Sequence, residues 1–134
     1  MMRKQNVFDI INQKLIQFNI RVYFAHHAVS DFKGFSAGKK NQIIALIIKQ
    51  AQKGPLLRPD GNGIRLKGKL KDFGKIKNKA MNIRIIYRPV ESEDGIVEMQ
   101  IIAIGPRDRE EVYEKAKDRL TAFFAELENR KESN

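Results

Sequence analysis

The chain has 134 residues, 42% of them hydrophobic, which is enough to build the core of one ordinary domain. It contains no cysteine, which excludes disulfide bonds, a thiol nucleophile and cysteine-bound metals. The formal net charge of +10 is concentrated in the middle, because residues 32 to 90 carry 15 lysines and arginines against 2 acids. A field of this sign favours a polyanionic partner, either a nucleic acid or an acidic protein.

The first residues predict an amphipathic helix over residues 3 to 18. Apolar side chains recur there at helical spacing, at Val7, Ile10, Ile11, Leu15 and Phe18. Polar residues interrupt the segment, so it lacks the continuous apolar run of a signal peptide or a membrane span. We therefore expect a cytoplasmic protein without membrane association, in which a helical extension, residues 1 to 19, precedes the main domain, residues 20 to 128.

A strand and a helical hairpin are predicted next. Residues 20 to 25 are rich in β-branched and aromatic side chains, which is typical of a strand. A short helix is expected around Phe32, and Ser36 can cap a second helix that runs to about Gln52. The prolines and glycines of residues 54 to 63 indicate a loop that separates this hairpin from the rest of the chain.

The second half of the chain predicts a basic antiparallel sheet. The strand candidates cover residues 64 to 70, 73 to 78, 81 to 89 and 95 to 104. Glu-Asp-Gly at 93 to 95 gives a hairpin signal between the last two strands, so we expect a meander. Because alternate side chains of a strand point to opposite faces, one face of the first strand would carry Lys67, Lys69 and Lys71. Lys75, Lys77 and Lys79 repeat this alternation after Phe73-Gly74.

A final helix is expected after this sheet. The acidic side chains of Asp108, Glu110 and Glu111 lie in its first turn, where negative charge suits the helix dipole. An apolar stripe then runs from Val112 to Leu127. The last residues, 129 to 134, are expected to fray.

Four short motifs, in this order and spacing, carry a resemblance to a known family. They are Leu-Lys-Gly at 66 to 68, Lys-Ile-Lys at 75 to 77, Ile-Arg-Ile-Ile-Tyr-Arg at 83 to 88 and Ile-Gly-Pro-Arg-Asp-Arg-Glu-Glu-Val-Tyr at 104 to 113. With the predicted elements, they resemble the RelE branch of the RelE/ParE toxin superfamily, from about Arg21 to Leu120. The resemblance implies a small α+β fold, an antiparallel meander with a helical hairpin packed on one face and a C-terminal helix.

The resemblance also implies a function and partners. Toxins of the RelE branch are endonucleases that cleave messenger RNA in the ribosomal A site and are neutralised by a cognate antitoxin. The implied partners are messenger RNA on the ribosome, 16S ribosomal RNA and an acidic, DNA-binding antitoxin. The family's RNA-binding and cleavage positions match Lys75, Lys77, Arg84, Arg107 and Tyr113, with Arg109 as an accessory match.

The chemistry of RNA cleavage gives these side chains roles. Attack by the neighbouring 2′-hydroxyl requires a base, an acid for the departing 5′-oxygen and cations for the phosphate, but no metal or other cofactor. Like charges disfavour the ammonium form, which makes Lys75 or Lys77 a candidate base. Arg107 can hold two phosphate oxygens, and Tyr113 can act as the acid or stack on a base. The remaining cations predicted to bind RNA are Lys67, Lys69, Lys71, Lys79 and Arg109.

Two alternative functions stay open. A ParE-like protein would use the same fold to inhibit DNA gyrase, although those relatives generally lack the basic and tyrosine constellation. A non-catalytic module would bind RNA or DNA through the cationic sheet, and two departures from the family pattern, Gly74 and Pro106, leave room for it. Arg88 is assigned a structural role, as a surface arginine that pairs with Glu98 across the hairpin.

Overall fold

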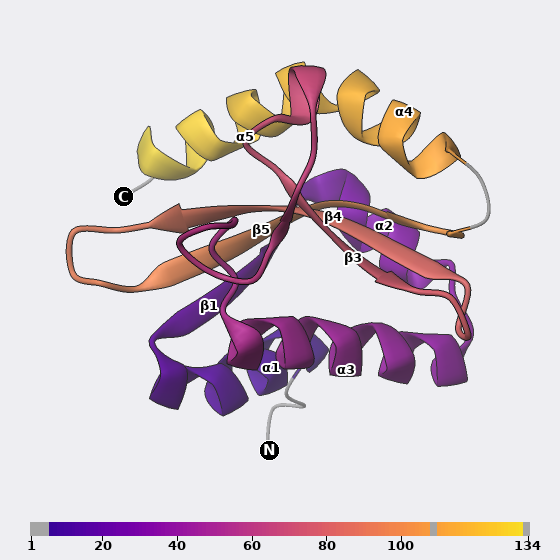
Figure 1. Ribbon diagram of the computed structural model, residues 1–134, viewed down its shortest axis with the longest axis horizontal. Helices are drawn as coiled ribbons and strands as arrows, with labels where there is room; N and C mark the ends of the chain where they lie inside the picture. The colour runs from indigo at the N-terminus through magenta and orange to yellow at the C-terminus, as the bar shows by residue number, and fades with distance from the viewer. Residues whose placement is uncertain (1–5, 108–109, 133–134) are drawn as a thin grey trace, which may run out of the picture.

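The computed structural model describes residues 6 to 107 and 110 to 132, and a five-stranded sheet lies at its centre (Figure 1). The strands lie in the order β1 (Ile20–Phe24), β5 (Val97–Gly105), β4 (Ile83–Glu91), β3 (Gly74–Asn78) and β2 (Ile64–Arg65). The α+β class is confirmed, but the all-antiparallel meander is wrong in one place, because β1 lies parallel to β5. Parallel pairing needs a long connection, and the chain between β1 and β5 holds two helices and the other three strands.

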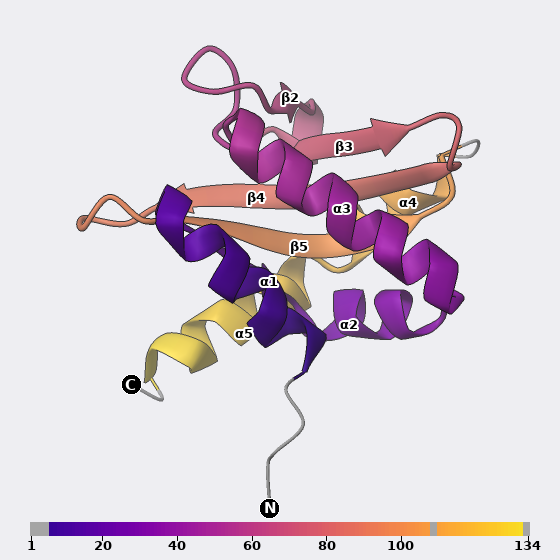
Figure 2. The ribbon, with the colours of Figure 1, turned by 90° about the horizontal axis from the view of Figure 1, so that it is seen from below.

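One face of the sheet is covered by the first helices, which include the predicted helical hairpin. α1 (Val7–Leu15) and α3 (Ala37–Lys53) cross this face (Figure 2), and α2 (His26–Lys33) follows β1 directly. Ser36 caps α3 as predicted, because its hydroxyl accepts a hydrogen bond from the Lys39 N–H at 3.2 Å. The core on this face includes the buried side chains of Ile11, Leu15, Ile43, Ile47 and Ile85.

The N-terminal helix is anchored to the edge of the sheet. α1 covers the middle of the helix predicted over residues 3 to 18, and a 3₁₀ turn, η1 (Ile16–Phe18), follows it. The side chain of Asn12 accepts a hydrogen bond from the Val22 N–H at 2.7 Å and donates one to the Val22 carbonyl at 3.2 Å. These two bonds fix the helix against β1, so the predicted extension shares the core of the domain.

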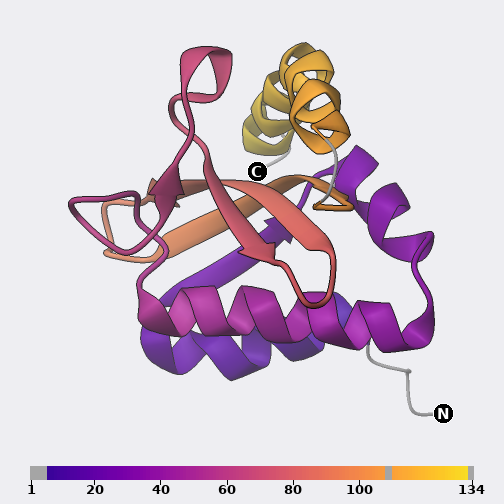
Figure 3. The same ribbon diagram turned by 45° about the vertical axis from the view of Figure 1, so that its right-hand side comes forward.

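The opposite face is covered by the end of the chain, so the sheet lies between two helical layers (Figure 3). The predicted final helix is divided at Arg119 into α4 (Glu111–Asp118) and α5 (Leu120–Glu132). The helix also continues past residue 129, where fraying was expected, because Arg130 donates a hydrogen bond to Glu98 Oε1 at 2.7 Å. Within the described part of the chain, no helix has the length and apolar character needed to cross a bilayer.

The strand predicted over residues 64 to 70 is largely wrong. β2 ends at Arg65, and a 3₁₀ turn, η2 (Gly68–Leu70), replaces the rest of it. Gly68 has a φ of 63°, a conformation that favours glycine, and the chain turns there. Leu70 then enters the core under α4 and α5, with 2% of its surface exposed. The lysines predicted to alternate on this strand are instead exposed in and around η2; they are Lys67, Lys69 and Lys71.

Candidate active site

β3 and β4 bring three of the predicted site residues to the face that α4 covers. Lys77 of β3 lies directly opposite Arg84 of β4, and Lys75 is on the same face because it is two residues away. The intervening Ile76 and its partner Ile85 are buried in the core on the other face. The alternation predicted for Lys-Ile-Lys is therefore present in β3.

Tyr113 joins these cations from the first turn of α4. The guanidinium carbon of Arg84 lies 4.6 Å from the centre of the Tyr113 ring, and the Lys75 ammonium lies 6.0 Å from it. Both distances are within the usual range for cation–π contacts. Gly105 lets α4 approach the sheet, because an added Cβ would lie only 3.3 Å from the Cβ of Val112.

Arg107 follows the end of β5 and is held beside the turn that joins β3 to β4. Its backbone N–H donates hydrogen bonds to the side-chain oxygen of Asn82 at 3.1 Å and to the Asn82 carbonyl at 3.3 Å. Asn82 has a φ of 54°, a left-handed conformation that asparagine tolerates better than most residues. The charge of Arg107 acts on the Tyr113 hydroxyl, which places both residues in one electrostatic site.

The cations of this site differ in exposure, since Arg84 is buried, Lys75 and Arg107 are half-buried and Lys77 is exposed. Arg84 is 8% exposed, and its Nε and Nη1 atoms have no hydrogen-bond partner among the described residues; the Nε of Arg107 has none either. Within residues 6 to 107 and 110 to 132, no carboxylate forms an ion pair with Lys75, Lys77, Arg84 or Arg107. Buried donors are normally satisfied, so this arrangement favours binding of an external anion.

Tyr113 keeps its proton at neutral pH. Burial raises the pKa of its hydroxyl above the usual value, and the Glu110 carboxylate acts in the same direction. The positive charges of Arg84 and Arg107 oppose this rise without cancelling it. Tyr113 is therefore in the form that a general acid requires.

An ion pair that the sequence did not reveal anchors the end of α4. Arg119 donates two hydrogen bonds to the Asp31 carboxylate, at 2.7 and 2.9 Å, and a third to the Ile102 carbonyl at 2.9 Å. Asp31 also accepts a bond from the Ile104 N–H at 3.0 Å. The pair thus satisfies backbone groups beside an irregularity in the β4–β5 register and fixes α4 on the sheet. No local pattern signals it, since the partners are 88 residues apart.

The remaining predicted residues lie around the site or outside the described chain. Lys79 is exposed in the turn between β3 and β4. Lys69 lies within η2, which contacts α4, and Lys67 and Lys71 flank this turn. Arg109 lies outside the described residues. RNA binding by these five residues stays a prediction. No group of three potential metal-ligating side chains occurs among the described residues.

Arg88 has a structural contact, with a different partner from the predicted one. Its Nη1 donates a hydrogen bond to Gln100 Oε1 at 3.3 Å, and its guanidinium carbon lies 5.0 Å from the centre of the Phe124 ring. Glu98 instead binds Arg21 and Arg130. The register explains the difference, because Arg88 lies opposite Gln100 rather than Glu98.

A comparison with solved structures finds a similar fold in a RelE toxin, which confirms the predicted RelE-like fold. The isolated RelE toxin of E. coli superimposes with a TM-score of 0.50 and 20% sequence identity, covering 74% of this chain and 96% of that one. An E. coli RelE mutant in complex with an antitoxin RelBc peptide gives a TM-score of 0.48 at 20% identity, with 71% and 90% coverage.

A conserved hypothetical protein of Helicobacter pylori gives a TM-score of 0.40 at 20% identity, covering 66% of this chain and 94% of that one. No family model matches the sequence, and neither does any curated protein. At these identities the comparisons establish the fold, and any functional conclusion has to rest on the site.

Proposed function

We propose that this protein is the toxin of a toxin–antitoxin pair and cleaves messenger RNA in the ribosomal A site. The observation that carries the proposal is the cluster of Arg84, Arg107 and Lys75 around a protonated Tyr113, without an acidic partner among the described residues. Such a cluster suits a phosphate that gains negative charge during the reaction. The shared fold with the E. coli RelE toxin supports the same reading.

The proposed reaction uses the RNA's own 2′-hydroxyl. Lys75 or Lys77 takes the proton of that hydroxyl, and the 2′-oxygen attacks the adjacent phosphorus. The bond from phosphorus to the 5′-oxygen breaks, and Tyr113 donates its proton to the departing oxygen. A 2′,3′-cyclic phosphate and a 5′-hydroxyl result. Arg84 and Arg107 stabilise the charge on the phosphate oxygens, so the residues supply each function that the reaction requires.

The proposed partners follow from charge and from the reaction. Cleavage in the A site places the protein on ribosomes in the cytoplasm, where the exposed Lys67, Lys69, Lys71 and Lys79 would contact 16S ribosomal RNA. An acidic antitoxin with a DNA-binding part would cover the same basic surface. Residues 32 to 90 carry 15 lysines and arginines against 2 acids. This excess of positive charge attracts both ribosomal RNA and an acidic antitoxin.

The test is induction of variant chains in growing bacteria, followed by primer extension on messenger RNA. Tyr113→Phe and Arg107→Ala should each lower cleavage by about 10²–10³-fold and remove growth arrest, because they remove the acid and a phosphate ligand. Tyr23→Phe and Arg21→Ala remove the same groups at positions away from the site and should leave cleavage intact.

The outcomes separate the proposal from other functions of the fold. Clean cuts between codon positions in the wild type, lost in both site variants, would support the nuclease. Growth arrest with intact messenger RNA would refute it in favour of a gyrase inhibitor, and RNA binding without cuts or arrest would refute it in favour of a binding module.

A further inference from the structure

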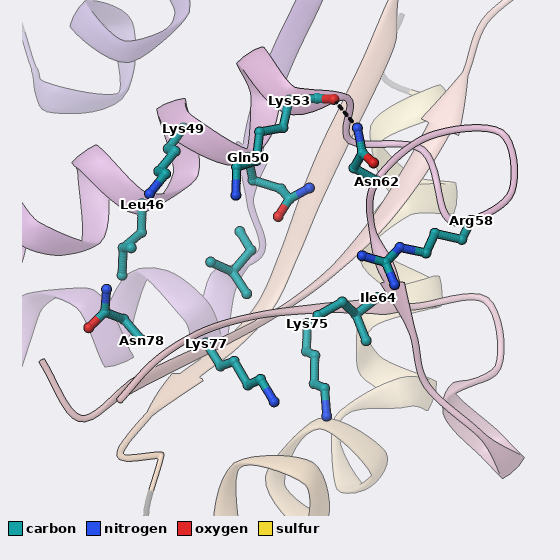
Figure 4. Close-up of a pocket in the computed structure, with 11 residues that line it drawn as sticks. Leu46, Lys49, Gln50, Lys53, Arg58, Asn62, Ile64, Lys75, Lys77 and Asn78 are labelled. Carbon is teal, nitrogen blue, oxygen red and sulfur yellow. Dashed lines mark hydrogen bonds between the residues drawn. The ribbon is translucent and has the colours of Figure 1, made fainter. Parts of the chain in front are cut away.

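A second basic surface lies on the other side of β3, and its cations on α3 and the loop have no role in the proposed reaction. A groove of about 430 Å³ runs between α3 and β3 and ends at the loop of residues 54 to 63 (Figure 4). Its volume is within the range of about 300–1,000 Å³ that is usual for small-molecule sites. The apolar part of its lining is Leu46, Ile64 and Ile76.

Three cationic side chains and no acid surround the groove on the α3 side of β3. Lys49 and Lys53 lie one helical turn apart on α3, and Arg58 comes from the loop. Lys75 and Lys77 of β3 also line the groove, but their side chains point away from α3, toward the candidate active site (Figure 4). None of the first three has an ion-pair partner among the described residues, although all are exposed. In Figure 4 the Arg58 guanidinium extends from the loop toward Ile64 and β3. Such a concentration of one sign of charge attracts an anionic ligand.

The wall of the groove is held in place by hydrogen bonds. Asn62 donates from its side chain to the Lys53 carbonyl at 2.6 Å, and its backbone N–H donates to the Gly54 carbonyl at 3.0 Å. The buried hydroxyl of Tyr87 donates to the Pro55 carbonyl at 2.8 Å. The loop that carries Arg58 is therefore tied both to α3 and to the sheet, and the groove is preformed.

The groove and the candidate active site lie on opposite faces of β3 and share two residues of that strand. Lys75 and Lys77 line the groove, and the Lys75 ammonium also lies 6.0 Å from the centre of the Tyr113 ring. β2 pairs with β3 only at Gly74 and Lys75, so within the described residues no strand covers the outer edge of β3 beyond that point. A linear ligand that crosses this open edge can contact both surfaces.

We propose that the groove is a binding subsite for an unpaired RNA nucleotide and its phosphate, next to the nucleotides at the cleavage site. The proposal rests on the proposed function, because a chain that continues from that site is RNA. An unpaired strand fits better than a duplex, since its base can enter the groove and contact the apolar lining, the guanidinium of Arg58 and the amide groups of Gln50 and Asn78. The cations at the rim hold its phosphates.

The test measures RNA binding by the 134-residue chain with the Tyr113→Phe substitution, which suppresses cleavage during the titration. Fluorescent oligouridylates of about three and about seven nucleotides are titrated at several salt concentrations, with anisotropy as the readout. The longer RNA should bind about tenfold or more tightly than the shorter one, because only it reaches the groove. Adding Lys49→Gln, Lys53→Gln and Arg58→Gln should remove this gain and lower the salt slope for the longer RNA by about 2.

The matched control removes three exposed cations elsewhere, by Lys14→Gln, Lys33→Gln and Lys131→Gln on α1, α2 and α5. The control chain carries the same net charge as the groove variant and should keep the gain with length. The subsite would be overturned if the groove variant still bound the longer RNA more tightly than the shorter one by the same factor. It would also be overturned if the control variant lost this preference to the same extent. Groove-dependent binding of an oligoglutamate peptide, with RNA binding unchanged by the groove substitutions, would overturn it in favour of an acidic protein partner.

The result is independent of whether cleavage occurs. If primer extension shows no cuts but the groove variant loses the gain with length, the subsite stands and the nuclease falls. If cuts appear and the gain is unaffected by the groove substitutions, the nuclease stands and the subsite falls.

Discussion

Arg84 and Arg119 show how the surroundings of one side chain separate function from stability. Both contact the face of the sheet that α4 covers, but Arg119 is fully paired with Asp31, whereas two nitrogens of Arg84 have no partner among the described residues. A buried charge without a partner destabilises the fold, because lost hydration is not replaced. In the proposed function, the phosphate of the RNA supplies the partner that these two nitrogens lack.

Substitution of Arg84 should therefore stabilise the protein and inactivate it. Arg84→Met keeps most of the volume and removes the desolvated charge, so the free energy of unfolding in urea should rise by about 1–2 kcal/mol. Messenger RNA cleavage should fall by about 10²–10³-fold because a phosphate ligand is lost. A less stable Arg84→Met chain would show that Arg84 is a structural residue.

Arg119→Met is the matched control at a paired arginine. It leaves the Asp31 carboxylate without its main partner, and the free energy of unfolding should fall by about 3 kcal/mol. A loss of unfolding free energy below about 0.5 kcal/mol, as is usual for a surface substitution, would contradict the anchoring role of the Arg119–Asp31 pair.

At the scale of elements, Gly74 decides how the loop of residues 54 to 63 meets the sheet. A Cβ at this position would lie 2.7 Å from Leu57 Cδ2 and 3.2 Å from the Tyr87 ring. The departure from the family pattern before Lys-Ile-Lys therefore has a packing reason. The neighbouring Phe73 does not replace an aromatic base-stacking contact, because it is 2% exposed and packs 5.6 Å from Phe123.

Gly74→Ala should accordingly destabilise the protein by about 1–3 kcal/mol in urea denaturation, because β3 or the loop has to move. Gly38→Ala is the comparison, since nothing lies within 4 Å of a Cβ there and the residue is in α3. This second change should stabilise by about 0.5–1 kcal/mol. Equal effects of the two substitutions would contradict the close packing at Gly74.

For the whole molecule, two buried carboxylates link the helical layers to the sheet and make stability depend on pH. Burial opposes ionisation of Asp31, but Arg119 and the Ile104 N–H outweigh it and hold the pKa of Asp31 below its usual value. For Glu98, burial is likewise outweighed, by hydrogen bonds from Gln100, Arg130 and Arg21. A lowered pKa in the folded state stabilises the protein above the unfolded pKa values, about 3.9 and 4.3.

This stabilisation should be complete near neutral pH and decline as pH falls below about 4 toward the folded pKa values. The measurement compares melting temperatures of the wild type and the Asp31→Asn, Glu98→Gln double variant. The difference should be largest at about pH 7 and shrink by about pH 3, because protonation removes the same charges that the variant lacks. A difference that is constant over this range would contradict the assignment.

How far the sequence alone predicted the site depends on the distance between partners along the chain. Lys75 and Lys77 were assigned to one face from alternation, and the family motifs identified Arg84 and Tyr113. The cations of the groove left only a weak signal, the spacing of Lys49 and Lys53 on one helix. No local sequence pattern indicated the ion pair between Arg119 and Asp31.

The sequence by itself determined the α+β class, the helical hairpin with its Ser36 cap, the basic middle of the chain and the alternation in β3. These features depend on periodicity, capping and charge, which neighbouring residues set. Only the tertiary structure decided the parallel pairing of β1, the replacement of a strand by η2 and the unpaired state of Arg84 among the described residues. Burial of Leu70, contacts across the sheet and loss of water arise from residues far apart in the chain, so no local pattern records them.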